Sequence, residues 1–256
     1  MLILIAESKT MTSCDRVVTL TPENRPLLDW KVDDIMFSLR GMTAEQLASA
    51  VKISLPMARR LHDVIYEFGD KRHGARAIEA FTGVVFNAFR YSMLSDEDKL
   101  LSNSKIRIIS SLYGLLRPSD IVKSYRFDFT TKLAPGNESF ATYWRDEVTD
   151  LLVKELKSNG ENEVLNLLPG DAERELDWIR IKEIARVAKV GFIEMISAGN
   201  CKTPNANRLK TLRGELLRQI IVERIDSLDE LCRLENNDYV ADGTIAPDGT
   251  ITFTTA

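Results

Sequence analysis

The sequence has few of the side chains that build metal or disulfide sites. It contains 2 histidines and 3 cysteines in 256 residues, and no two cysteines have the CxxC spacing of zinc and redox motifs. We therefore expect neither a metal nor another cofactor. We also expect Cys14, Cys201 and Cys232 to be reduced thiols.

Long apolar runs and flexible linkers are scarce as well. The apolar start, residues 2–5, leads at once to Glu7 and Lys9. No later stretch approaches the roughly 20 apolar residues that a membrane span needs. No Pro-, Gly- or Ser-rich segment divides the chain, and 44% of its residues are hydrophobic, enough for one large core. These features predict a single domain over residues 1–256, located in the cytoplasm, with no membrane partner.

An excess of positive charge is also missing. The 34 basic residues face 38 acidic ones, which gives a net charge of −4. This balance argues against a surface coated with positive charge for nonspecific nucleic-acid binding. A local basic cleft remains compatible with it, because basic residues cluster at Arg59-Arg60, at Lys71-Arg72 and between Lys202 and Arg224.

Hydrophobic periodicity predicts a mixed α/β fold with a central mixed β-sheet flanked by helices. We expect strands at residues 2–6, 107–109, 163–168 and 189–197, and helices at residues 33–39, 44–51, 57–66, 142–156 and 209–224. Thr43 and Gln46 have the spacing of a capping box. Asp248-Gly249, between Thr- and Ile-containing runs, predicts a hairpin near the end of the chain.

Polar side chains gather in the segment Arg107–Asp128, around a glycine and a proline. Its first residues predict a short buried strand. Leu115–Pro118 predicts a turn, since the residue before a proline is disfavoured in a helix. Polar groups at the end of a strand are typical of a ligand site. The alternative is that the arginines here only pair with neighbouring carboxylates.

The same segment carries a resemblance to a known family. SSLYGLLRPSD followed by YRFDF resembles the SGLYGLLRPLD…YRLEM signature of the YaaA family of bacterial peroxide stress proteins. MLILIAESKT resembles the family's start, MLILISPAKT, and further similar motifs follow in the same order at residues 80–86, 140–146, 164–167 and 210–218. The resemblance implies a cytoplasmic protein of the hydrogen peroxide response that limits free iron and DNA damage.

Several basic and hydroxyl side chains are candidates for binding an anion. Arg213 projects onto the apolar stripe of its predicted helix, where it either pairs with an internal carboxylate or reaches a ligand. Gly214 beside it predicts close approach of another backbone or a ligand. The predicted ligand- or anion-binding residues are Ser8, Lys9, Thr10, Arg117, Asp120, Arg126 and Arg213. Lys9 and Tyr113 are the candidate catalytic acid–base groups. We expect Lys9, Arg117, Arg126 and Arg213 to converge on one cleft.

The segment Leu47–Leu61 predicts two short helices joined by a tight turn. It is similar to the helix-hairpin-helix that the YaaA family is described as carrying, which contacts DNA phosphates through backbone N–H groups. Lys52 and Ser54 stand where the usual motif has glycines. An ordinary pair of antiparallel helices is the alternative. The predicted DNA-binding residues are Lys52, Ser54, Arg59, Arg60 and Lys210.

One loop departs from the family pattern. After residues 164–167 the family continues with Ser and then a Glu-Tyr pair, whereas this chain has Leu168-Pro169-Gly170-Asp171-Ala172. Two functions therefore compete. The first is a stress-response protein that binds duplex or branched DNA in a basic cleft. The second is an enzyme acting on a small anionic or nucleotide-like substrate.

Overall fold

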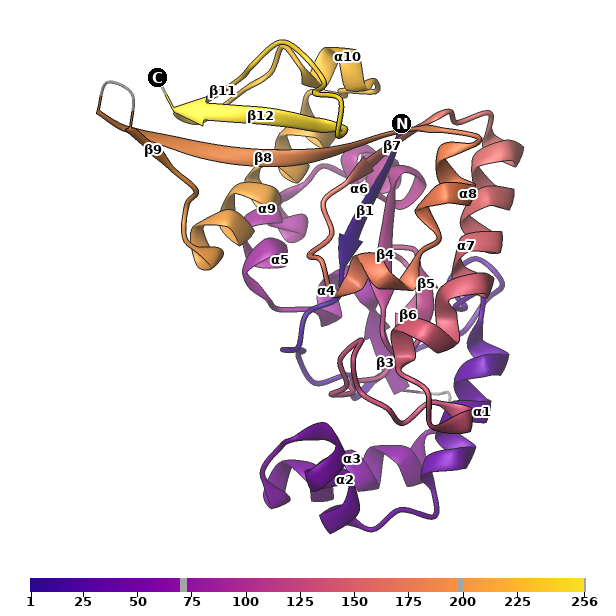
Figure 1. Cartoon of the computed structure of the whole chain (residues 1–256). Coiled ribbons are helices and arrows are strands. Elements are labelled where there is room, and N and C mark those ends of the chain that lie inside the picture. Colours follow the sequence, from indigo (N-terminus) through magenta and orange to yellow (C-terminus); the bar gives the residue numbers. More distant parts are fainter. Residues whose placement is uncertain (70–72, 198–199, 256) are drawn as a thin grey trace.

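The computed structural model describes residues 1–69, 73–197 and 200–255, so Lys71-Arg72 lie outside the described residues. Within these residues the main sheet has nine strands in the order β10-β11-β12-β8-β7-β1-β4-β5, and β9 pairs with β8 (Figure 1). Its strands are β1 (Leu2–Ala6), β4 (Ile106–Ser110), β5 (Gly114–Leu116), β7 (Glu163–Asn166), β8 (Arg186–Ser197), β9 (Asn200–Lys202), β10 (Glu235–Asn236), β11 (Tyr239–Ala241) and β12 (Thr250–Thr255). A second sheet contains β2 (Arg16–Val17), β3 (His73–Arg76) and β6 (Ile121–Val122).

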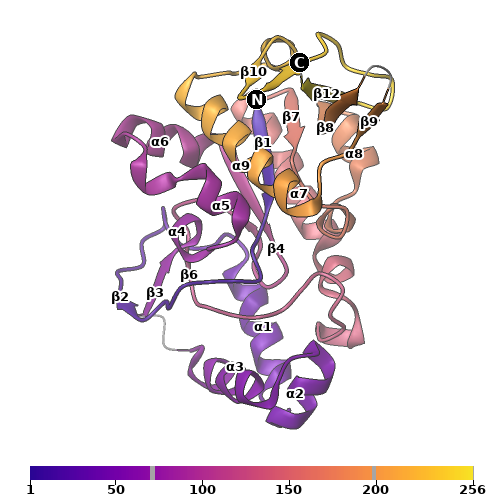
Figure 2. The ribbon, with the colours of Figure 1, turned by 90° about the vertical axis from the view of Figure 1, so that its left-hand side faces the viewer.

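The centre of the main sheet is parallel. β1 pairs in parallel with β4 on one side and with β7 on the other, so that Ile3 lies opposite both Ile106 and Leu165. β8 and β12 continue the parallel part. Strands with helices on both faces are buried on both faces, which explains the unbroken apolar run of β1. Figures 1 and 2 show α5 and α9 on one side of β1 and β4, and α7 on the other.

All five predicted helices are present. Three extend beyond the predicted bounds by a few residues, the one at 44–51 matches them, and the last begins at Ala206 and ends at Val222, two residues before its predicted end. The other helices of the described residues were not predicted. The helices are α1 (Asp29–Leu39), α2 (Ala44–Val51), α3 (Leu55–Glu67), α4 (Ala77–Ala80), α5 (Val84–Phe89), α6 (Asp96–Lys105), α7 (Phe140–Asn159), α8 (Trp178–Lys182), α9 (Ala206–Val222) and α10 (Leu228–Leu231), with single 3-10 turns η1 (Tyr91–Met93), η2 (Pro135–Asn137) and η3 (Ala172–Glu175). The capping box of α2 is confirmed: Thr43 N donates to Gln46 Oε1 over 2.8 Å, and Gln46 N donates to Thr43 Oγ1 over 3.3 Å. None of the described helices is long and apolar enough to cross a membrane.

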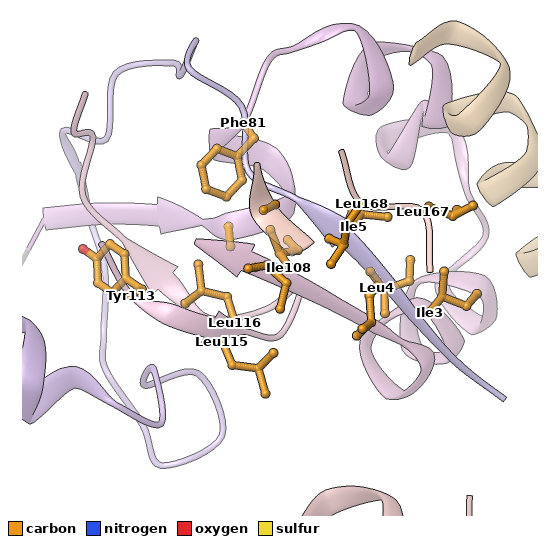
Figure 3. Packing of buried hydrophobic residues seen from close by; sticks show 14 of the residues in the cluster. Ile3, Leu4, Ile5, Phe81, Ile108, Tyr113, Leu115, Leu116, Leu167 and Leu168 are labelled. Atoms are coloured by element: carbon orange, nitrogen blue, oxygen red, sulfur yellow. The ribbon is translucent and has the colours of Figure 1, made fainter. Parts of the chain in front are cut away.

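The core lies around the central strands. Figure 3 shows Ile3, Leu4 and Ile5 of β1 beside Ile108 of β4 and Leu167 after β7, all of them buried. Each such side chain contributes roughly 1.5–3 kcal/mol by burial. The core therefore holds the ends of β1, β4 and β7 in fixed positions.

One predicted turn is wrong. Leu115 and Leu116 belong to β5, which runs antiparallel to β4 with Ser110 opposite Gly114, so the chain reverses before the predicted turn. Pro118 disfavours a helical backbone only at Arg117, the residue before it. An extended backbone at Arg117 is compatible with the end of β5. The hairpin predicted near the end of the chain is confirmed: β11 and β12 are consecutive antiparallel strands, and Gly249 N donates to the Ala246 carbonyl over 2.8 Å in the turn before β12. On its other side β12 pairs in parallel with β8, which was not predicted.

Gly214 behaves as the sequence predicts. It lies where α9 crosses α5, and a Cβ atom on it would come within 2.3 Å of the Val85 carbonyl oxygen and 2.7 Å of the Ala88 Cβ. A glycine is therefore needed for this close packing. The contact also places Arg213, the preceding residue, near the start of α5.

Candidate functional site

A pocket of about 660 Å³ lies beside α3, and a second of about 630 Å³ lies at the ends of β1 and β7. We consider the second pocket the candidate site, because the order of the strands reverses there. After β1 the chain adds β4 on one side of β1, and it later adds β7 on the opposite side. In open α/β sheets, ligands bind beyond the carboxyl ends of the strands at such a switch point. We call this cavity the switch-point pocket; its lining residues are Ile5, Ala6, Glu7, Ser8, Lys9, Thr10, Gly83, Val84, Val85, Phe86, Asp128, Phe129, Leu167, Pro169, Asp171, Lys210 and Arg213.

The loop after β1 is held in place by local hydrogen bonds. Thr10 N donates to Ser8 Oγ over 3.1 Å, and the two hydroxyls lie 3.0 Å apart. Thr82 N donates to the Thr10 carbonyl over 2.9 Å. A Cβ on Gly83 would come within 2.3 Å of Ser8 Oγ and 2.8 Å of Ser8 Cβ, so a larger residue here would displace the Ser8 side chain. Ser8 and Thr10 thus border the pocket in a tight turn, as hydroxyl residues often do.

Lys9 is exposed and forms an ion pair with Asp128, with 3.2 Å between Nζ and Oδ2. Arg126 Nη1 donates to the Lys9 carbonyl over 3.2 Å, which places a second cation beside it. A lysine acting as a base needs desolvation to lose its proton. The exposure of Lys9 therefore favours an electrostatic contact with an anion over a catalytic base.

Arg213 is the cation most suited to a ligand. It is partly buried, and among the residues that the structure describes its guanidinium forms no hydrogen bond or ion pair. Burial lowers the pKa of Arg213, and the charge of Glu173 opposes this effect. Lys210, one turn earlier on α9, lines the same pocket. A guanidinium without a carboxylate partner beside apolar walls is suited to bind a phosphate or carboxylate.

Glu7 is a pocket residue that the sequence analysis missed. Its carboxylate accepts hydrogen bonds from Ser111 N over 3.0 Å, from Ser111 Oγ over 2.6 Å and from the Tyr125 hydroxyl. Burial raises the pKa of Glu7 to about 7, although these hydrogen bonds act in the opposite direction. The sequence did contain a signal: the family strings have proline at the position of Glu7 and glycine at that of Ser111.

A second carboxyl group, that of Glu175 in η3, is fully buried. Among the described residues, neither of its oxygens has a hydrogen-bond partner. Burial, and secondly the charge of Glu7, raise the pKa of Glu175 well above its usual value. Burial of Glu175 therefore opposes its ionisation, and its carboxyl lies close enough to Glu7 to be affected by the charge of that group.

Four of the predicted anion-binding and catalytic residues do not line the switch-point pocket: Arg126, Asp120, Arg117 and Tyr113. Arg117 and Tyr113 show why. Arg117 donates from Nε to Asp120 Oδ1 over 2.9 Å and from Nη2 to the Arg25 carbonyl over 2.9 Å, and Asp120 is fully buried. The Tyr113 hydroxyl accepts a hydrogen bond from Lys123 N over 2.9 Å, and burial raises its pKa well above the usual value. The structure thus gives these two side chains partners of their own.

The predicted DNA-binding residues lie mainly on the α2–α3 hairpin at one end of the molecule (Figures 1 and 2). Lys52 ends α2 with a left-handed backbone, at φ 58°, and Ser54 precedes α3 without a side-chain cap. Arg59 and Arg60 are exposed on α3. A smaller depression of about 240 Å³, which we call the hairpin groove, is lined by Lys9, Met11, Met57, Arg60, Leu61, Val64, Ser124, Tyr125 and Arg126. Lys9 borders both the groove and the switch-point pocket.

Other reactive groups are less suited to chemistry. Cys14, Cys201 and Cys232 are free thiols, and burial raises the pKa of Cys14 to about 11. In the described part of the chain, no three His, Cys, Asp or Glu side chains are grouped to hold a metal ion.

The sheet and the helices on its two faces define an α/β protein, with a charged pocket at the switch point of the sheet. The chain belongs to the peroxide stress protein YaaA family, whose model matches residues 1–244, and this confirms the sequence resemblance. The chain is 31% identical over 237 residues to a UPF0246 protein of Phocaeicola vulgatus, with 90% of each chain covered. It is 28% identical over 234 residues to one of Parabacteroides distasonis, covering 90% of each chain, and 29% identical over 254 residues to one of Desulforapulum autotrophicum, covering 96% of each.

Proposed function

We propose that this member of the peroxide stress family binds DNA along a surface that runs from the α2–α3 hairpin to the switch-point pocket. The observation that carries the proposal is the position of Lys9, which borders both depressions. Arg60 and Arg126 line the hairpin groove beside it. A series of cations at the boundary of two depressions suits a chain of phosphates.

The start of α3 supports a phosphate contact. Ser54 makes no side-chain hydrogen bond to the first turn, so the N–H groups of Leu55 and Met57 remain available to a ligand. Pro56 has no N–H, and Ala58 N donates to the Ser54 carbonyl. Lys52 lies directly before this turn, and Arg59 and Arg60 follow within α3. The net charge of −4 restricts DNA to this local surface, because the rest of the protein repels a polyanion.

A salt titration tests the DNA proposal. The logarithm of the affinity should fall with the logarithm of salt concentration with a slope of about −0.9 per phosphate neutralised. Substitution of Lys52, Arg59 and Arg60 by Gln should flatten the slope by about 0.9 for each phosphate that is no longer neutralised. Lys154→Gln, an exposed position on α7 away from both depressions, is the matched control. Linear and junction duplexes that fail to bind even at low salt would exclude DNA as a ligand.

A small anionic ligand in the switch-point pocket is the second candidate function. The specific observation in its favour is Arg213, which reaches the pocket without a carboxylate partner among the described residues. The pocket also combines charged groups with apolar walls at Val84, Phe86 and Phe129. A volume of about 630 Å³ is within the range of small-molecule sites.

Arg213→Met tests the second candidate. Methionine retains most of the apolar bulk and removes the guanidinium, so stability should stay within about 0.5 kcal/mol or increase, since an uncompensated charge is removed. Stabilisation by bound phosphate or nucleotides in thermal melts should disappear. Arg117→Met is the matched control, because it leaves buried Asp120 unpaired and should cost about 3 kcal/mol. A strongly destabilised Arg213→Met protein with unchanged ligand effects would refute the anion site.

A further inference from the structure

We propose that Glu7 is a ligand-binding acid–base group of the switch-point pocket. The pocket would then take a small molecule that combines an anionic group, bound by Arg213 and Lys210, with an amino group, bound by Glu7. This inference rests on the second candidate function and specifies its ligand class. It does not depend on whether the hairpin binds DNA.

The contacts of Glu7 suit it to this role. Its backbone N–H extends the β1–β4 ladder by donating to the Ile109 carbonyl over 2.9 Å, which fixes the start of its side chain. Its carboxylate is oriented by the Ser111 and Tyr125 donors, and the Tyr125 hydroxyl is held in turn by Ser110 Oγ at 2.6 Å. All of these donors are neutral. Within the described residues, no lysine or arginine forms an ion pair with Glu7, so its charge remains available to a ligand.

The charged groups around Glu7 come from several elements. They are Lys9 and Asp128, which pair with each other, Asp171 in the loop after β7, Glu175 in η3, whose pKa is raised by burial, and Lys210 and Arg213 on α9. Glu7 and Arg213 thus bring opposite charges from β1 and α9 to one cavity. An ionised Glu7 repels a simple anion and attracts an ammonium group. A ligand that carries both charges complements both.

Protonation of Glu7 makes this selectivity depend on pH. Its pKa of about 7 means that its charge changes in the neutral range. A simple anion should therefore bind more weakly as pH rises. An anion that also carries an ammonium group should bind more tightly over the same range.

Binding of three probes by calorimetry tests the proposal. Sulfate, propanesulfonate and aminopropanesulfonate keep their charges between about pH 6 and about pH 8. At constant ionic strength the dissociation constants of sulfate and propanesulfonate should rise on the order of tenfold over this range, because ionised Glu7 repels them. The dissociation constant of aminopropanesulfonate should fall. Glu7→Gln should abolish these three pH dependences, and Arg213→Met should weaken all three probes at every pH.

Each result has a definite consequence. Equal affinities of wild type and Arg213→Met for the probes, or no binding at all, would refute the anion pocket itself. Binding that depends on Arg213 but has the same pH profile in wild type and Glu7→Gln would overturn the role of Glu7 and leave the anion pocket in place. An aminopropanesulfonate affinity that never exceeds that of propanesulfonate would overturn the ligand class. Should Glu7→Gln not fold, carbon NMR of the wild-type Glu7 carboxyl decides: sulfate must raise its pKa, and an unchanged pKa refutes the proposal.

Discussion

Replacing Glu7 by Gln should stabilise the protein, and the gain should grow with pH. Glutamine fits the existing hydrogen bonds. In the wild-type protein Ser111 N and the Tyr125 hydroxyl donate to Glu7 Oε2, and the amide oxygen of glutamine can accept the same two bonds. The NH2 group of glutamine can take the place of Oε1 and donate to Ser111 Oγ, since a hydroxyl also accepts. The substitution therefore removes the ability to ionise with little change in shape.

The size of the effect follows from the pKa of Glu7. Folding raises this pKa from 4.5 to about 7, chiefly by burial. Between these values the folded chain binds a proton that the unfolded chain has released. The free energy of unfolding must then fall as pH rises through this window. A shift of that size corresponds to about 3 kcal/mol above pH 7. The side chain is partly open to the pocket, so solvent screening makes this an upper value.

Urea denaturation from about pH 5 to about pH 8 measures the effect. Glu7→Gln should unfold at nearly the wild-type midpoint at the acid end and at a higher midpoint at the alkaline end. Exposed Glu138→Gln controls for the loss of one negative charge and should show no such trend. A stability difference between wild type and Glu7→Gln that is constant across this range would refute the idea that burial of an ionisable Glu7 opposes folding.

Two further substitutions test the structure around the pocket. Gly214→Ala should destabilise the fold by about 2 kcal/mol in thermal melts, because the alanine Cβ would overlap the Val85 carbonyl. The cost of this overlap outweighs the gain of about 1 kcal/mol in helix propensity. Gly41→Ala, where a Cβ meets no atom within 4 Å, is the control, and a Gly214→Ala melt no lower than that of Gly41→Ala would contradict the close packing. Glu175→Met should stabilise the protein by about 1–3 kcal/mol, since two unpaired buried oxygens are removed, and a loss of stability would mean that Glu175 has a partner.

Local patterns in the sequence predicted much of the fold. The apolar run of β1, the periodicity of α2 and α3, and the capping box at Thr43 depend on neighbouring residues, and the structure contains all three. The wrong turn at Leu115–Pro118 and the unpredicted pairing of β12 both concern contacts between strands. Gly114 reverses the chain at φ 68° to bring β5 onto β4, and β12 pairs in parallel with β8 in addition to its antiparallel pairing with its hairpin partner β11. Pairing between distant strands leaves little trace in a local pattern.

For the candidate site, the sequence predicted residue types better than partners. It indicated Lys9 and Arg213 as anion-binding residues, and the structure brings both to one cavity. It grouped Arg117 with them, although Arg117 pairs with Asp120 three residues later. Glu7 was missed because its environment consists of Ser111 and Tyr125, which are more than 100 residues away along the chain.

Several departures from the family strings meet at one place. Glu7 and Ser111 replace the proline and glycine of those strings and bond to each other, while Pro169 and Asp171 of the altered loop line the same pocket. A partly desolvated carboxyl at Glu7 opposes folding at neutral pH. Groups that reduce stability persist most readily where function uses them. The switch-point pocket is therefore the part of this molecule where a ligand different from that of other family members is most readily explained. The α2–α3 hairpin lies at the other end of the hairpin groove and can have a separate role.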